Sequence, residues 1–183
     1  MIIGITGPKQ SGKTTLARYI AEHSDLYWEI KGFATPLKQI VSILTGVNVY
    51  DMDSEKIKSS QLSDITGEDW DNYTVRKFLQ FVGTDLFRKQ VHPDIWIRAA
   101  LRDYDKNTNW IMADVRFQNE VEAIKKLGGK VIKIQPRQKV KPEHTSEELN
   151  INYKNIDTVV YNFGSLEMLY NNAEQVLKNI INM

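Results

Sequence analysis

Apolar and polar residues follow two patterns along this chain: short apolar runs, and apolar residues at helical spacing. Together, the two patterns predict strands that alternate with helices. Short apolar runs predict buried strands at residues 1–6, 27–34, 110–113, 130–134 and 157–162. Apolar residues at helical spacing predict helices over residues 14–24, 36–46, 75–91, 94–106 and 117–127, and a last helix that begins at Ser165. This alternation predicts a single α/β domain whose central sheet is mostly parallel and is flanked by helices.

Two stretches interrupt the pattern. Residues 47–71 are polar, with scattered charges and little periodicity, and are expected to form a long surface excursion. Gly83 lies inside the helical pattern of residues 75–91, where it predicts a bend or a break.

Length, charge and cysteine content narrow the class of protein. The 183 residues suit one domain, and 24 basic against 23 acidic residues give a net charge of +1, which argues against a partner that is a nucleic-acid polymer. No apolar run reaches the roughly 20 residues that span a bilayer, and no signal peptide is evident. Without cysteine, disulfides and thiolate chemistry are excluded. We expect a cytoplasmic protein with no membrane partner.

One motif carries most of the chemistry. Gly7-Pro8-Lys9-Gln10-Ser11-Gly12-Lys13-Thr14 fits G-x-x-x-x-G-K-[ST], between a predicted strand and a predicted helix. Glycines allow backbone N–H groups to converge on phosphate oxygens, and the lysine adds a positive charge toward the β- and γ-phosphates. The motif therefore predicts binding of a nucleoside triphosphate by Gly7, Lys9, Ser11, Gly12, Lys13, Thr14 and Thr15.

An acidic residue completes the predicted triphosphate site. Asp114 follows the apolar run 110–113, as does the acid that holds Mg²⁺ in P-loop proteins. Thr14 offers a hydroxyl to the same ion. We therefore expect Mg²⁺ as a cofactor, with Thr14 and Asp114 as its ligands.

Basic residues outside the loop point to the second substrate. No N-K-x-D stretch is present to read guanine, so a switch GTPase is not indicated. A kinase that acts on a phosphorylated acceptor needs cations for the acceptor's phosphate and for the charge that builds up during transfer. The basic residues that could supply them are Lys38, Arg76, Arg88, Arg98, Arg116 and Arg137.

The order of four further strings resembles the phage-type deoxynucleoside monophosphate kinases. They are "GFATPLK", "LQFVGTDLFR", "ADVRFQNEVEAIKKLGG" and "HTSE", behind the P-loop. The resemblance covers most of the chain. It implies an NMP-kinase-like P-loop fold, ATP as phosphoryl donor, and a deoxynucleoside 5′-monophosphate as the small-molecule substrate.

The resemblance also assigns roles to residues. It implies that the acceptor is bound by Lys38, Arg76, Gln80, Thr84, Asp85, Arg88 and Trp96, with Trp96 offered as a surface for the base, although a core tryptophan is the commoner explanation. It implies that catalysis rests on Lys13, Arg88, Arg116 and Arg137. Arg137 belongs to an expected lid at about residues 135–150, and the acceptor-binding insertion is expected at about residues 35–105.

Two alternatives stay open at this point. One keeps the kinase but changes the acceptor, to a phosphomevalonate or dephospho-coenzyme A type of molecule. The other is a regulatory protein that binds a nucleotide without transferring phosphate. The sequence leaves undecided which bases are accepted, whether deoxyribose is preferred, and whether the protein forms a homodimer.

Overall fold

The chain divides into two compact units, which we describe separately in a computed structural model. The model describes residues 1–136, 144, 150–164 and 166–181. Unit 1 comprises Met1–Gly32 and Asp103–Met183, and unit 2 comprises Phe33–Arg102. Unit 2 spans nearly the residues of the insertion expected at about 35–105.

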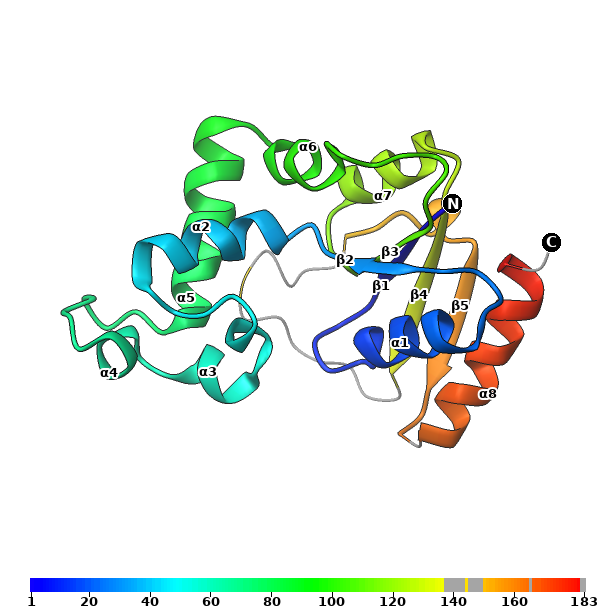
Figure 1. Cartoon of the computed structure of the whole chain (residues 1–183), viewed down its shortest axis with the longest axis horizontal. Helices are drawn as coiled ribbons and strands as arrows, with labels where there is room; N and C mark the ends of the chain where they lie inside the picture. Colours follow the sequence, from blue (N-terminus) through cyan, green and yellow to red (C-terminus); the bar gives the residue numbers. More distant parts are fainter. Residues whose placement is uncertain (137–143, 145–149, 165, 182–183) are drawn as a thin grey trace. The chain divides into compact units, whose positions relative to one another are not determined.

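Unit 1 is built on a parallel sheet of five strands (Figure 1). Its strands are β1 (Ile2–Thr6), β2 (Glu29–Lys31), β3 (Trp110–Val115), β4 (Lys130–Pro136) and β5 (Thr158–Asn162). Their order across the sheet is β2-β3-β1-β4-β5, and every neighbouring pair is parallel. The expected α/β class is confirmed. Because β1 lies at the centre, the loop that follows it starts at the middle of the sheet's carboxyl edge, where such sheets bind ligands.

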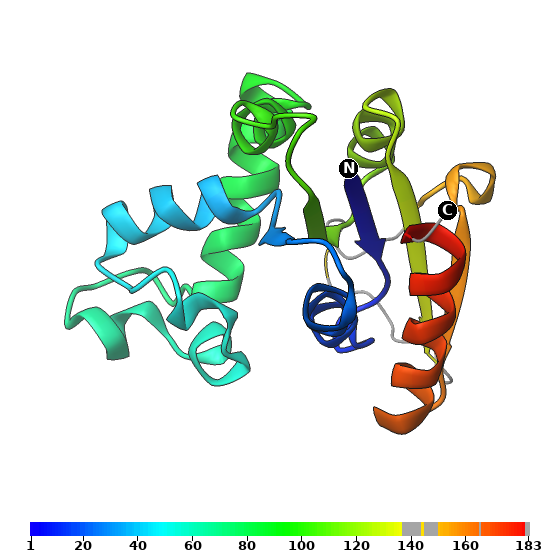
Figure 2. The ribbon, with the colours of Figure 1, turned by 45° about the vertical axis from the view of Figure 1, so that its right-hand side comes forward.

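Helices cover both faces of this sheet (Figure 2). They are α1 (Lys13–His23), α7 (Gln118–Lys126) and α8 (Leu166–Val176), which continues as the π-helical η5 (Leu177–Ile181); η4 (Tyr153–Asn155) is a short 3₁₀ turn. Ile3 and Ile5 pack with α1 and α8 in one buried cluster. Gly4 faces α7, because a Cβ there would lie 2.5 Å from Ile124 Cδ1. Both faces of β1 are therefore buried, as its unbroken apolar sequence predicts.

Asp157 ties together the elements at the far side of this sheet. Its carboxylate accepts hydrogen bonds from Lys125 Nζ at 2.8 Å and from the Val131 N–H at 2.7 Å, and Lys130 Nζ lies 3.6 Å away. Burial alone would raise the pKa of Asp157, but the hydrogen bonds from Lys125 and Val131 and the charges of both lysines lower it below its ordinary value.

Unit 2 is helical and has its own core. Its helices are α2 (Thr35–Thr45), α3 (Glu55–Ser59), α4 (Leu62–Thr66), α5 (Val75–Gln80) and α6 (Ile95–Leu101), with a 3₁₀ turn η1 (Asp51–Asp53) and a π-helical segment η2 (Phe81–Val91) that continues α5. Met52 and Leu62 are fully buried with Val41 and Val75.

Several expected elements differ from the observed ones. Residues 47–71 are not an unstructured excursion: their helices are five residues or fewer, too short to show a period, yet they bury Met52 and Leu62. The helix of residues 75–91 does not break at Gly83, where a Cβ would lie 2.6 Å from Leu37 Cδ2, so the glycine allows α2 to come close. β2 keeps only three of the eight expected residues, and it pairs with β3 alone at one edge of the sheet.

Candidate active site

The loop between β1 and α1 has the backbone of a phosphate-binding loop. Gly12, the residue before α1, is left-handed with φ +98°, and the first helical bond runs from the Leu16 N–H to the Gly12 carbonyl at 2.9 Å. Gln10 is also left-handed, with φ +60°. Alternation of left- and right-handed residues turns successive N–H groups toward one side, where they form a concave site for anions.

Close packing below the loop fixes this shape. A Cβ on Gly7 would lie 2.7 Å from Ser11 Oγ and 2.8 Å from the Ile134 carbonyl oxygen, so only glycine fits. From the end of β5, the Asn162 side chain donates a hydrogen bond to the Ser11 carbonyl at 3.0 Å. The loop is therefore held by β4 and β5 as well as by its own sequence.

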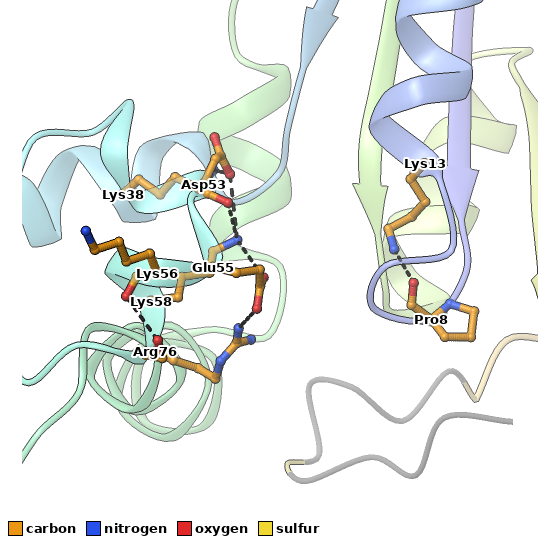
Figure 3. Close-up of polar contacts among 9 residues, drawn as sticks. Pro8, Lys13, Lys38, Asp53, Glu55, Lys56, Lys58 and Arg76 are labelled. Atoms are coloured by element: carbon orange, nitrogen blue, oxygen red, sulfur yellow. Dashed lines mark hydrogen bonds and ion pairs between the residues drawn. The ribbon is translucent and has the colours of Figure 1, made fainter. Parts of the chain in front are cut away.

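The polar groups of the loop suit a polyphosphate. Ser11 Oγ and Thr6 Oγ1 are buried and have no hydrogen-bond partner among the residues that the structure describes. Lys13 Nζ donates to the carbonyls of Gly7 at 2.8 Å and Pro8 at 2.6 Å, which holds its charge at the loop (Figure 3). Buried hydroxyls without partners are rare in folded proteins, and a bound ligand or water is one explanation for them. A phosphate chain fits this set of donors.

Asp114 owes its position to an irregularity in β3. Along β1, Gly4 pairs with Met112 and Thr6 pairs with Val115, so β3 has one extra residue at this point. Such a bulge redirects side chains, and bulges are frequent beside active sites. The Asp114 carboxylate lies against Gly32, where a Cβ would be only 2.7 Å from Oδ2. The expected acid is thus half-buried near the carboxyl end of β3, next to β1.

Metal binding at this site would depend on few protein ligands. In the described part of the chain, no group of three or more His, Cys, Asp or Glu side chains could hold a metal ion. Thr14 lies in the first turn of α1 and is exposed, and Asp114 is half-buried. One carboxylate and one hydroxyl beside a phosphate site suit Mg²⁺, which keeps several waters and binds to substrate phosphates.

Arg116 lies two residues beyond Asp114, where α7 begins. Buried Glu120 accepts hydrogen bonds from the backbone N–H groups of Arg116 at 2.7 Å and Phe117 at 3.1 Å. This carboxylate satisfies N–H groups at the start of α7 and fixes the turn that carries Arg116. The sequence "DVRFQNE" therefore holds both Asp114 and Arg116 at one corner of unit 1.

In unit 2, two expected acceptor ligands form part of a charged network (Figure 3). Lys38 on α2 donates a hydrogen bond to Asp53, and Arg76 Nη2 on α5 lies 2.7 Å from Glu55 Oε2. Lys58 on α3 links the two pairs, since its Nζ lies 3.9 Å from both Asp53 Oδ1 and Glu55 Oε1. Three cations from three helices therefore gather around two carboxylates.

Four other expected acceptor ligands follow Arg76 along the same helical run. Gln80 ends α5, and Thr84, Asp85 and Arg88 lie on the π-helical η2, a rare conformation that is often functional. Asp85 Oδ1 pairs with Lys89 at 2.7 Å, and Arg88 Nη1 donates to the Pro93 carbonyl at 3.2 Å. Thr84 is buried.

Trp96 requires a correction. The resemblance offered it as a surface for a base, but it is only 3% exposed, and its Nε1–H donates to the Gly83 carbonyl at 2.8 Å. Its ring packs against Phe87. Trp96 therefore belongs to the core of unit 2 and supports η2 instead of presenting a free ring face.

The remaining expected residues make few contacts that define a site, or lie outside the described residues. Lys9 lies within the loop, Thr15 directly follows it, and both are half-buried. Arg137 and most of the expected lid at residues 135–150 lie outside the described residues. Arg98 is exposed and lies 3.2 Å from the His92 ring.

Sequence reasoning missed four residues at these sites. Gly32, Asn162 and Glu120 contact predicted site residues, and Lys58 contacts the two acids that pair with Lys38 and Arg76. Only Glu120 had a usable signal, since a glutamate three residues after a helix start marks a capping position. Gly32 and Asn162 depend on contacts between segments that are distant in sequence, and Lys58 lies on a five-residue helix that is too short to show a period.

The sheet order, the loop after the central strand and the carboxylate on the neighbouring strand define a P-loop α/β protein. The family model for deoxynucleotide monophosphate kinase matches residues 35–173. The chain therefore belongs to the deoxynucleotide monophosphate kinase family. The described part of the chain has no helix long and apolar enough to cross a membrane.

Individual relatives agree with this assignment. A protein of Acanthamoeba polyphaga mimivirus named "Putative deoxynucleotide monophosphate kinase" is 33% identical, over 100% of this chain and 99% of its own length. The deoxynucleotide monophosphate kinase of Enterobacteria phage T4 is 28% identical, over 75% of this chain and 61% of its own length. A solved dephospho-CoA kinase from Campylobacter jejuni has a TM-score of 0.45 at 13% identity, over 98% and 96% of the two chains. A likeness at that level says nothing about the function of this chain.

Proposed function

We propose that this protein transfers the γ-phosphoryl group of ATP to a deoxynucleoside 5′-monophosphate. Membership of the deoxynucleotide monophosphate kinase family, matched over residues 35–173, carries the proposal. It favours a nucleotide acceptor over the phosphomevalonate or dephospho-coenzyme A type, and an enzyme over a regulator that only binds nucleotides.

On the donor side, the loop residues Gly7 to Thr15 bind the triphosphate. Backbone N–H groups contact its oxygens, Ser11 supplies a hydroxyl, and Lys13 supplies a full charge toward the β- and γ-phosphates. Thr14 and Asp114 would hold Mg²⁺. When bound, this ion neutralises charge on the β- and γ-phosphate oxygens. Arg116 adds a cation from the end of β3.

On the acceptor side, Lys38, Arg76, Gln80, Asp85 and Arg88 bind the monophosphate, and Arg88 also takes part in catalysis. A phosphate acceptor is already ionised at neutral pH, so no general base is needed. Catalysis then depends on holding the attacking oxygen in line and on neutralising charge. Arg137 is assigned the same neutralising role from the lid.

A coupled assay of ADP release tests the proposal. Mg-ATP is supplied with each common deoxynucleoside and ribonucleoside monophosphate, and one reaction has no acceptor. We expect ADP only when an acceptor is present, with a subset of deoxynucleotides preferred. Release without acceptor, or ATP binding without any release, would overturn the proposal and favour the other two readings.

Two variants test the assigned sides of the reaction. Lys13→Ala should abolish turnover and leave the fold intact, because its charge acts at the phosphates. Arg88→Ala should raise the KM for the monophosphate or lower kcat, with ATP binding unchanged. If Arg88→Ala weakens ATP binding instead, Arg88 belongs to the donor side.

A homodimer and a cytoplasmic location remain predictions, which sedimentation and cell fractionation would test.

A further inference from the structure

The charged network of unit 2 has a central member that sequence reasoning did not select. Lys58, from α3, lies between Lys38 on α2 and Arg76 on α5 (Figure 3). Its Nζ is 3.9 Å from carboxylate oxygens of both Asp53 and Glu55, and it donates a hydrogen bond to the Asp53 carbonyl at 3.3 Å. The order of charges is therefore Lys38, Asp53, Lys58, Glu55 and Arg76, with three positive charges and two negative.

Cations and acids in this network differ in burial. The side chains of Lys38, Lys58 and Arg76 are 18, 22 and 19% exposed. Those of Asp53 and Glu55 are 69 and 45% exposed. Long basic side chains often bury their stems while the charged head stays in water. At Lys58, burial also reaches the charged group, because it lowers the pKa of this lysine. The acids lie closer to solvent, where they can move away.

The crowding of like charges has a cost at Lys58. Burial lowers its pKa, and the charges of Lys38 and Arg76 lower it further, against the opposite effects of Asp53 and Glu55. The charged form of Lys58 is therefore incompletely compensated by the two acids. A dianionic group would compensate it better, because one phosphate places two negative charges and three acceptor oxygens at one point.

From this arrangement we propose that Lys58 joins Lys38 and Arg76 in binding the 5′-phosphate of the acceptor, and that Asp53 and Glu55 compete with that phosphate for the same cations. The inference rests on the proposed function. It adds one phosphate ligand and a pair of competing carboxylates to it.

Lys58→Gln and Lys56→Gln form a matched pair of variants. Both lysines lie on α3, but Lys56 is exposed and its ammonium group points away from Glu55 and Arg76 (Figure 3). Lys58→Gln should raise the KM for the monophosphate roughly 10- to 100-fold, the value of a hydrogen bond to a charged group, with the KM for ATP unchanged. Lys56→Gln should leave both constants within twofold of the wild type.

Asp53→Asn tests the competition, because its expected effect has the opposite sign. The amide keeps a hydrogen-bond acceptor for Lys38 but removes the negative charge, so the KM for the monophosphate should fall roughly 2- to 5-fold. A network that only stabilises the fold predicts the same direction for Asp53→Asn and Lys58→Gln, since both break it. If Lys58→Gln does not fold, Asp53→Asn alone decides.

The corresponding deoxynucleoside, which lacks the phosphate, separates contact with the phosphate from general damage to the site. Its inhibition constant against the monophosphate should be the same in the wild type and in all three variants. The inference is overturned if Lys58→Gln and Lys56→Gln have the same KM for the monophosphate, or if Asp53→Asn raises this KM. It is also overturned if Lys58→Gln weakens the binding of the deoxynucleoside as well as that of the monophosphate. These outcomes presuppose a wild type that releases ADP only with an acceptor, so failure of the proposed function is seen separately.

Discussion

Replacing Gly32 by alanine should damage catalysis through a single contact. Gly32 directly follows β2, and an added Cβ would lie 2.7 Å from Asp114 Oδ2 and 3.0 Å from Asp114 Cγ. Gly32 is not among the glycines with positive φ, so alanine suits its backbone. The perturbation is therefore confined to the carboxylate that we assign to Mg²⁺.

The size of the effect follows from these distances. A Cβ on residue 32 would lie 2.7 Å from Asp114 Oδ2, whereas Cβ contacts shorter than 3.0 Å are essentially never seen and ordinary van der Waals contact begins at 3.4 Å. The Asp114 carboxylate must therefore move away by 0.3 to 0.7 Å. A misplacement of about 1 Å at a catalytic group costs up to ~10²-fold in rate. We expect kcat to fall roughly tenfold or more, and the Mg²⁺ concentration for half-maximal rate to rise.

The assay is the coupled ADP-release measurement at saturating ATP and acceptor, across a Mg²⁺ titration. Gly128→Ala is the control, since it has φ +78° and no atom within 4 Å of an added Cβ. It should lose about 1 kcal/mol of stability through backbone strain and keep its kcat. A Gly32→Ala enzyme with kcat and Mg²⁺ dependence within twofold of the wild type would refute the role of Asp114.

Three further variants test contacts elsewhere in unit 1. Gly129→Ala should lose about 3 kcal/mol in denaturant unfolding, more than Gly128→Ala, because its Cβ would lie 2.6 Å from backbone oxygen; an equal loss would contradict this. Asp157→Asn should lose about 1 to 3 kcal/mol at pH 7. Since the folded pKa of Asp157 is lowered, the wild type loses this advantage as pH falls below about 4, and the two unfolding curves should converge there. Asn162→Ala should raise the KM for ATP several-fold, because the Ser11 carbonyl loses its hydrogen bond; an unchanged KM would show that β5 does not hold the loop.

The features that could be predicted from the sequence are those formed by residues close together in the chain. The loop of residues 7–14 forms its site from consecutive backbone N–H groups, so its motif predicts the position of the site without knowledge of the fold. Strand β1 and helix α1 were likewise predicted to within a residue, because their apolar positions repeat at regular spacing. Residues 47–71 were misjudged because helices of five residues carry no repeat.

Tertiary structure decided the remainder. An α/β protein with a phosphate-binding loop and an acid on a nearby strand follows from the sequence alone, since each of these features rests on residues that are adjacent in the chain. Only the fold brought Gly32 against Asp114, Asn162 against Ser11, Lys38 against Asp53 and Arg76 against Glu55. Those contacts join segments with no shared pattern, and they arise because the sheet order and the packing of short helices bring distant residues together.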